Sequence, residues 1–167
     1  IYKGAILSVY KDYIEFPNGG TAEWDFIQHD GAAAVVPVME DGRILMVQQY
    51  RNALDRKTLE IPAGKLDTPD ESGLECSRRE LEEETGYRSE KLEWLLTLRT
   101  TIAFCNEKIE IYVAKDLIPS HQHLDEGEYV DVKAYTMEEL KEMIFTGKVE
   151  DSKTIAALLA YESKYLK

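Results

Sequence analysis

The sequence predicts an α+β fold, in which helices pack on a mixed β-sheet. Segments with strand character outnumber segments with helical character, and the two kinds do not alternate strictly along the chain. Strict alternation would instead favour a doubly wound parallel sheet. The chain has 167 residues, of which 44% are apolar, and this suits one domain with a short extension.

The first 30 residues are expected to form a small antiparallel extension. Short strand-like runs occupy residues 5–10 and 13–16, and residues 17–20 read Pro-Asn-Gly-Gly, which favours a tight turn. Residues 21–28 then have the character of a returning strand. A unit of this size is not expected to be stable alone, so it should pack on residues 31–167 or on a second copy of the chain.

Three strands and a helix are predicted in the next part of the chain. A buried strand at 32–38 is followed by Asp41-Gly42, which predicts a hairpin turn into a return strand at 43–49. A third strand at 58–61 is expected to stop at Pro62-Ala63-Gly64. The helix is predicted from about Glu71 to Thr85, because Gly86 is suited to end it.

The second half of the chain is predicted to add three strands and two helices. The strands are expected near residues 91–98, 108–113 and 129–134. Thr136 and Glu139 have the spacing of a capping box and predict a helix start. A last helix is expected at residues 152–165.

Charge and composition disfavour several classes of protein. The net charge of -12 argues against a general nucleic-acid binder, which needs a basic face. No apolar run reaches the roughly 18 residues of a membrane-spanning helix, and no signal peptide is apparent. Cys76 and Cys105 match neither a disulfide framework nor a metal-binding spacing, so we expect reduced thiols in a cytoplasmic protein.

Three carboxylates are expected on one face of the first predicted helix. At about 100° per residue, Glu80, Glu83 and Glu84 project from the same side. Leu74 and Leu81 share another side, which should face the core. Carboxylates this close repel one another, and a divalent cation that prefers oxygen ligands, such as Mg2+, removes that cost.

A simpler interpretation is a solvated acidic face, with Arg79 and Glu83 as an i,i+4 ion pair. The preceding sequence favours metal binding instead. Unless Gly64 only serves a turn, it lets the backbone approach a metal or phosphate closely. Glu71 stands where an acid suits the start of a helix.

Together these residues resemble the Nudix box of the Nudix hydrolase family. The usual box is Gly, five residues, Glu, seven residues, then Arg-Glu-apolar-any-Glu-Glu-any-Gly-apolar. Residues 79–87 match the second half, and the spacing from Glu71 to Arg79 also matches. Six residues separate Gly64 from Glu71, which we interpret as a one-residue loop insertion. The resemblance implies the Nudix fold, a mixed β-sheet packed between helices as an α/β/α sandwich, for residues 31–167.

The resemblance also implies roles for individual residues. Glu80, Glu83 and Glu84 are expected to be the metal ligands, together with the carbonyl of Ala63, and Glu83 is also expected to serve catalysis. Arg79 is expected to orient these carboxylates. The implied cofactor is Mg2+, with Mn2+ as a possible substitute; such ions bridge diphosphate oxygens and neutralise charge in the transition state.

Residues 47–51 and 59–66 are similar to the ADP-ribose pyrophosphatase branch of the family. That similarity implies that Arg51 contacts a phosphate or ribose of the substrate, that Glu60 shapes the same site, and that Gly64 lies against the substrate. The predicted reaction is hydrolysis of ADP-ribose to AMP and ribose 5-phosphate.

A departure downstream leaves other substrates open. The branch usually carries Ser-Pro-Gly before an acidic pair, whereas this chain has Ile102 and Ala103 in place of Pro and Gly, although Asn106-Glu107 is kept. Another NDP-sugar or a dinucleotide diphosphate is therefore an alternative substrate.

A second acidic cluster, Leu124-Asp125-Glu126-Gly127-Glu128, precedes the predicted strand at 129–134. In the branch a mobile loop here carries a Glu that acts as general base or metal ligand. We expect Glu126 to be the base, with Glu128 as second choice. The alternative interpretation is a solvated loop, since a base must come within about 3 Å of the attacking water.

The expected partners are a small nucleoside diphosphate substrate and a second copy of the chain, with no nucleic acid and no membrane. In the branch the N-terminal strands commonly exchange between subunits, which implies a homodimer. Tyr13, Trp24 and Phe26 either pack the extension or stack on a base across that interface. A non-catalytic ADP-ribose sensor and a purely structural acidic domain are the competing hypotheses.

Overall fold

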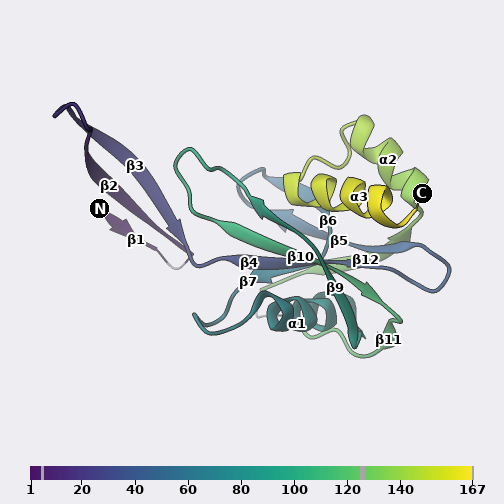
Figure 1. Ribbon diagram of the computed structural model, residues 1–167. Helices are drawn as coiled ribbons and strands as arrows, with labels where there is room; N and C mark the ends of the chain where they lie inside the picture. Colours follow the sequence, from purple (N-terminus) through teal and green to yellow (C-terminus); the bar gives the residue numbers. More distant parts are fainter. Residues whose placement is uncertain (5, 125–126, 167) are drawn as a thin grey trace.

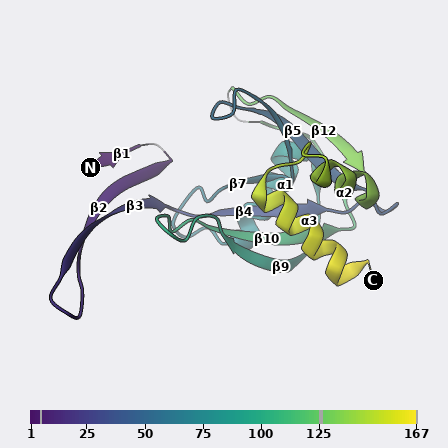
Figure 2. The same cartoon turned by 90° about the horizontal axis from the view of Figure 1, so that it is seen from above.

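The computed structural model describes residues 1–4, 6–124 and 127–166 (Figure 1). Its N-terminal part is a three-stranded antiparallel sheet in the order β1-β2-β3, formed by β1 (Tyr2–Lys3), β2 (Leu7–Glu15) and β3 (Thr21–His29). Gly19, with φ 81°, donates its N–H to the carbonyl of Phe16 at 2.9 Å and closes the predicted turn. Figures 1 and 2 show this sheet projecting away from the rest of the molecule.

Strand β2 is longer than the sequence predicts. We expected two runs broken at Lys11-Asp12, but β2 is continuous, and these residues pair with Asp25 and Trp24 of β3. Because β2 is largely exposed, polar residues on either face do not interrupt it.

The central sheet is mixed, as predicted. It has the order β7-β4-β10-β9, from β4 (Ala32–Pro37), β7 (Ala63–Lys65), β9 (Lys91–Arg99) and β10 (Lys108–Lys115). Strands β4 and β10 run parallel, whereas the other two pairs are antiparallel. Strand β7 was not expected from the sequence; it follows directly after Pro62 and pairs with the start of β4.

A second, antiparallel sheet has the order β12-β5-β6, from β5 (Ile44–Arg51), β6 (Arg56–Glu60) and β12 (Val130–Tyr135). The turn at Asp41-Gly42 forms as expected, with φ 84° at Gly42. The expected hairpin does not continue, however, because β4 and β5 part into different sheets after one bridge between Val38 and Ile44. A short pair, β8 (Tyr87–Arg88) and β11 (Ile118–Pro119), completes the strands.

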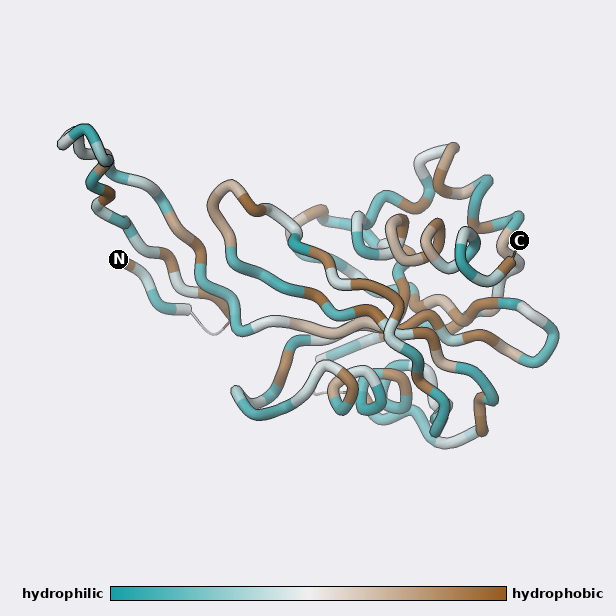
Figure 3. Tube along the Cα trace, in the orientation of Figure 1, coloured by the Kyte–Doolittle hydropathy of each residue, from teal (hydrophilic) through white to brown (hydrophobic). Residues whose placement is uncertain are grey.

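Helices cover both faces of the sheet layer. Helix α1 (Gly73–Thr85) lies on one face, and α2 (Met137–Phe145) and α3 (Ser152–Tyr165) lie on the other (Figures 1 and 2). The larger core cluster packs α2 and α3 against β4, β5, β9 and β10, and a smaller one, with Val35, Leu81 and Ala114, lies under α1. Apolar residues accordingly gather between the layers in Figure 3. The predicted sandwich is thus confirmed.

Helix α1 begins two residues later than predicted. Ser72 is its N-cap and Glu75 completes a capping box, so that Glu71 lies outside the helix. The predicted end is correct: Gly86 has φ 71° and donates its N–H to the carbonyl of Glu82. Thr136 caps α2 as predicted. Within the described part of the chain, no helix is both long and apolar enough to cross a membrane.

Candidate active site

Helix α1 presents its acidic residues to the edge of the central sheet. Leu81 is fully buried against Val35 and Ala114, as predicted, whereas Leu74 is half-buried. This packing fixes the rotation of the helix about its axis. Glu80 and Glu84, one turn apart, therefore face β7 and are buried, with exposed fractions of 9% and 4%.

Glu80 lies directly against the backbone of Gly64. A Cβ atom built on Gly64 would come within 3.0 Å of three carboxyl atoms of Glu80. The close approach expected from a glycine at this position is therefore present. Gly64 does not have a positive φ, so the absence of a side chain matters here, not the conformational freedom of glycine.

Glu84 is held by two donors from neighbouring strands. The backbone N–H of Ala63 donates to Oε2 at 3.0 Å, and the side-chain amide of Gln49 donates to Oε1 at 3.4 Å. Strands β5 and β7 thus converge on this carboxylate. The Ala63 carbonyl, which the family resemblance implies as a metal ligand, belongs to the same short strand.

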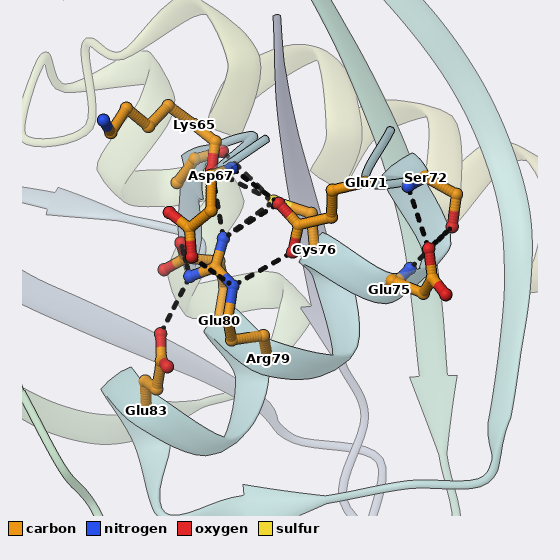
Figure 4. Close-up of polar contacts among 10 residues, drawn as sticks. Lys65, Asp67, Glu71, Ser72, Glu75, Cys76, Arg79, Glu80 and Glu83 are labelled. Atoms are coloured by element: carbon orange, nitrogen blue, oxygen red, sulfur yellow. Dashed lines mark hydrogen bonds and ion pairs between the residues drawn. The ribbon is translucent and has the colours of Figure 1, made fainter. Parts of the chain in front are cut away.

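Arg79 connects the carboxylates of the site to the loop before the helix (Figure 4). Its Nη1 donates to Glu80 at 2.7 Å and to Glu83 at 2.9 Å, and its Nε donates to Glu71 at 3.1 Å. Its Nη2 donates to the carbonyl of Lys65 at 3.1 Å. The predicted Arg79–Glu83 pair is present, but as one arm of a larger network. Glu71 therefore acts as a partner of Arg79, not as a residue of the first helical turn.

Burial and repulsion raise the pKa of both inner carboxyl groups. Burial raises the pKa of Glu84 to about 8, and the neighbouring charges of Glu80 and Glu128 contribute. Burial likewise raises the pKa of Glu80 to about 7 against the opposing effect of Arg79, and Glu83 and Glu128 raise it further. Burial and mutual repulsion therefore disfavour the ionised forms of both carboxyl groups, a cost that a bound cation would relieve.

These residues fit a hard divalent cation. Carboxylate and carbonyl oxygens are the ligands that Mg2+ prefers, and Glu80, Glu84 and the Ala63 carbonyl lie on adjoining elements around Gly64. No three acidic, histidine or cysteine side chains in the described ranges form a ready-made metal cluster. Glu80 and Glu83 share the guanidinium of Arg79.

Arg51 and Glu60 meet beside this acidic site. The guanidinium of Arg51 donates through Nε and Nη2 to the two oxygens of Glu60, both at 2.7 Å. Glu60 is 3% exposed, whereas the Arg51 side chain is 41% exposed. Arg51, Ala63 and Gly64 line one cavity of about 290 Å³. Arg51 and Gly64, two of the residues predicted to bind substrate, thus line a cavity next to the predicted metal ligands, and Glu60 contacts it through Arg51.

The general-base candidates are placed unequally. Glu126, the first choice, lies outside the described residues. Glu128 is exposed, and its charge acts on both Glu80 and Glu84. The charge of the second choice therefore acts on the acidic site.

Sequence reasoning missed two residues of the site. Gln49 contacts Glu84, and Lys153 contacts Glu60 at 2.5 Å from 93 residues further along the chain. A Lys in the first turn of an otherwise amphipathic helix gives no sequence signal for burial. Only the packing of α3 on the sheet brings it to the cavity.

Comparisons with known proteins identify the family. The NUDIX domain model matches residues 28–158. The chain is 39% identical to the methanol dehydrogenase activator of Bacillus methanolicus, over 95% of this chain and 86% of the relative. It is 36% identical to an ADP-ribose pyrophosphatase of Bacillus subtilis (strain 168), over 99% of this chain and 88% of the relative.

A solved structure supports the fold separately. A crystal structure of an ADP compounds hydrolase superposes with a TM-score of 0.87 at 23% identity, and the match covers 98% of this chain and 88% of that one. The domain match covers most of the chain, and the box residues gather around Gly64. The chain belongs to the Nudix family.

Proposed function

We propose that this protein is a metal-dependent pyrophosphohydrolase that cleaves ADP-ribose to AMP and ribose 5-phosphate. The observation that carries the proposal is the burial of Glu80 and Glu84 against Gly64, next to a cavity lined by Arg51. Relatives of this chain are named ADP-ribose pyrophosphatase in two bacterial species, at 36% and 32% identity.

The proposed cofactor is Mg2+, with Mn2+ as a substitute, held by Glu80, Glu83, Glu84 and the Ala63 carbonyl. When bound, the metal supplies positive charge to the diphosphate oxygens. Arg79 orients Glu80 and Glu83 by donating to both from one nitrogen. Gly64 is proposed to contact the substrate from the wall of the cavity, where its missing side chain leaves room for the carboxylate of Glu80.

Arg51 is proposed to bind and orient the substrate at the cavity wall. Its bidentate pair with Glu60 fixes the plane of the guanidinium, and its Nη1 makes no hydrogen bond with the described residues. A guanidinium held this way retains donors suited to a phosphate oxygen.

We propose that one glutamate of this loop, Glu126 or Glu128, is the general base that takes the proton from the attacking water. A glutamate close enough to raise the pKa of Glu80 and Glu84 lies near the carboxylates that hold the reaction centre. Replacing the true base by Gln should reduce kcat by about 10²- to 10⁴-fold. The other Gln variant serves as the matched control, and normal kcat in both would reject this role for the loop.

A substrate panel tests the proposed function directly. ADP-ribose, other NDP-sugars and dinucleotide diphosphates are incubated with Mg2+, with Mn2+ and with EDTA, and the products are separated by chromatography. We expect AMP from ADP-ribose with either metal and no turnover in EDTA. Preference for another diphosphate would replace ADP-ribose as the proposed substrate. Tight binding of ADP-ribose without cleavage would instead identify a sensor.

We also propose that residues 1–30 form a dimerising arm on the catalytic domain, residues 31–167. The arm leaves Tyr13 and Trp24 77% and 55% exposed, and a groove of about 930 Å³ runs between it and Phe104. A second copy of the chain is the proposed occupant. Sedimentation of the intact chain should give a dimer, which Trp24→Asp should weaken; a monomer at all concentrations would refute this.

Both free thiols fit the proposed cytoplasmic location.

A further inference from the structure

Glu60 accepts hydrogen bonds from three different side chains. Oε1 accepts from Arg51 Nε at 2.7 Å and from Thr58 Oγ1 at 2.6 Å. Oε2 accepts from Arg51 Nη2 at 2.7 Å and from Lys153 Nζ at 2.5 Å. A carboxylate has about four acceptor positions, so this one is fully used. Because Glu60 is 3% exposed, water has little access to replace a lost donor.

Lys153 is itself buried, with an exposed fraction of 9%. Its Nζ donates to Glu60 and, at 3.0 Å, to Asp151, which is the N-cap of α3. Buried ammonium groups are rare in proteins unless they are paired. Lys153 therefore has a defined position set by two carboxylates, one on β6 and one on its own helix.

The first turn of α3 is attached to the end of β6 at two consecutive positions. Lys153 holds the side chain of Glu60, and Thr154 Oγ1 accepts the backbone N–H of Ile61 at 3.0 Å. The chain continues from there through Pro62 to Ala63 and Gly64, which lie against Glu80 and Glu84. The contacts of Lys153 and Thr154 with β6 thus connect to Arg51 through Glu60 and to the acidic site through the chain that follows Ile61.

We infer that Lys153 is a positioning residue, which orients the guanidinium of Arg51 for the substrate by filling the last acceptor position of Glu60. The inference rests on the proposed function, since it assigns Arg51 to substrate binding. Without Lys153, the buried Oε2 of Glu60 loses one donor and Glu60 moves to regain one. Arg51 is bonded to both oxygens of Glu60 and moves with it.

Steady-state kinetics with ADP-ribose and Mg2+ test this role. Lys153→Met keeps the length of the side chain and removes its charge and donors. We expect KM to rise about tenfold or more, with kcat within about threefold of the wild type. Lys153→Arg restores a donor and should recover most of the KM. The control is Lys141→Met, which removes an ion pair from α2 to Glu162 of α3 away from the cavity.

A double-mutant cycle separates positioning from a structural effect. If Lys153 acts through Arg51, Lys153→Met should change KM by less than about twofold in an Arg51→Lys background. The inference would be overturned if the two substitutions raised KM independently, so that the double variant showed the product of the two single effects. Equal KM values for Lys153→Met and Lys141→Met would also overturn it. If Lys153→Met does not fold, Lys153→Gln and Lys153→Arg are compared in the same cycle. Absence of turnover in the wild type would instead refute the proposed function.

Discussion

The carboxylate of Glu80 occupies the space that a side chain at position 64 would need. A Cβ on Gly64 would come within 3.0 Å of its three carboxyl atoms. Glu80 is buried and its carboxylate accepts a hydrogen bond from Arg79, which limits its freedom to move away. This relationship requires glycine at position 64 and gives the first prediction.

Gly64→Ala should displace Glu80 and reduce kcat by about 100-fold or more, because a shift of about 1 Å in a catalytic group can have that effect. Turnover of ADP-ribose and a circular-dichroism melt measure activity and folding. The control is Gly20→Ala, where φ is not positive and the nearest atom, Oδ1 of the exposed Asn18, lies 3.2 Å from the added Cβ. Equal kcat in the two variants would contradict the assigned position of Glu80.

Glu83→Gln and Glu84→Gln should each reduce turnover by at least about 100-fold while the fold survives, because each variant loses a proposed metal ligand. Glu84→Gln should also lose most of the thermal stabilisation by Mg2+ that we expect in the wild type. Glu82→Gln is the matched control on the same helix, since its side chain contacts Ser120 and not the site. Near-normal activity in both ligand variants would reject their assigned roles.

The raised pKa values of Glu80 and Glu84, about 7 and about 8, predict how stability depends on pH without metal. A carboxyl group whose pKa is raised by folding binds its proton more tightly in the folded state than in the unfolded state. Its stabilising effect is complete below about pH 4.5 and is lost as the pH rises through the folded value. In EDTA, the free energy of unfolding should therefore fall between pH 5 and pH 8.5.

Urea titrations across that pH range measure this dependence. Glu84→Gln should flatten the curve and raise the melting temperature at pH 8.5, because one repelling charge is gone. Glu60, whose pKa is lowered to about 2 by Arg51, Lys153 and Thr58 against the effect of burial, adds no slope in this range. A wild-type curve that is flat in EDTA would exclude the raised values.

Arg79→Lys should reduce kcat by about tenfold or more, although the charge is kept. One guanidinium bonds Glu71, Glu80, Glu83 and the carbonyl of Lys65 at the same time, and an ammonium group cannot match that planar arrangement. The exposed Arg78 on the same helix supplies the control, Arg78→Lys. Similar kinetics for both variants would show that Arg79 contributes only its charge.

The sequence alone determined the features that depend on local pattern. The box residues, the cap at Gly86 and the capping box at Thr136 follow from spacing along one element, and the α+β class follows from the order of elements. Because a helix repeats every 3.6 residues, the common face of Glu80 and Glu84 was also predictable. Two predicted boundaries were wrong. The break expected at Lys11-Asp12 is absent because β3 pairs with β2 along its whole length, and the first helix starts after Glu71 because Ser72 caps it.

Only the tertiary structure decided which residues meet across the chain. The separation of β4 and β5 into two sheets, the buried contact of Glu80 with Gly64, and the link from Lys153 to Glu60 all join segments distant in sequence. A buried Lys and an exposed Lys look alike in a sequence, since burial is set by the surfaces that pack around it. The acidic helix supplies the chemical groups, and the packing of the sheets and α3 around it decides which of them lie together.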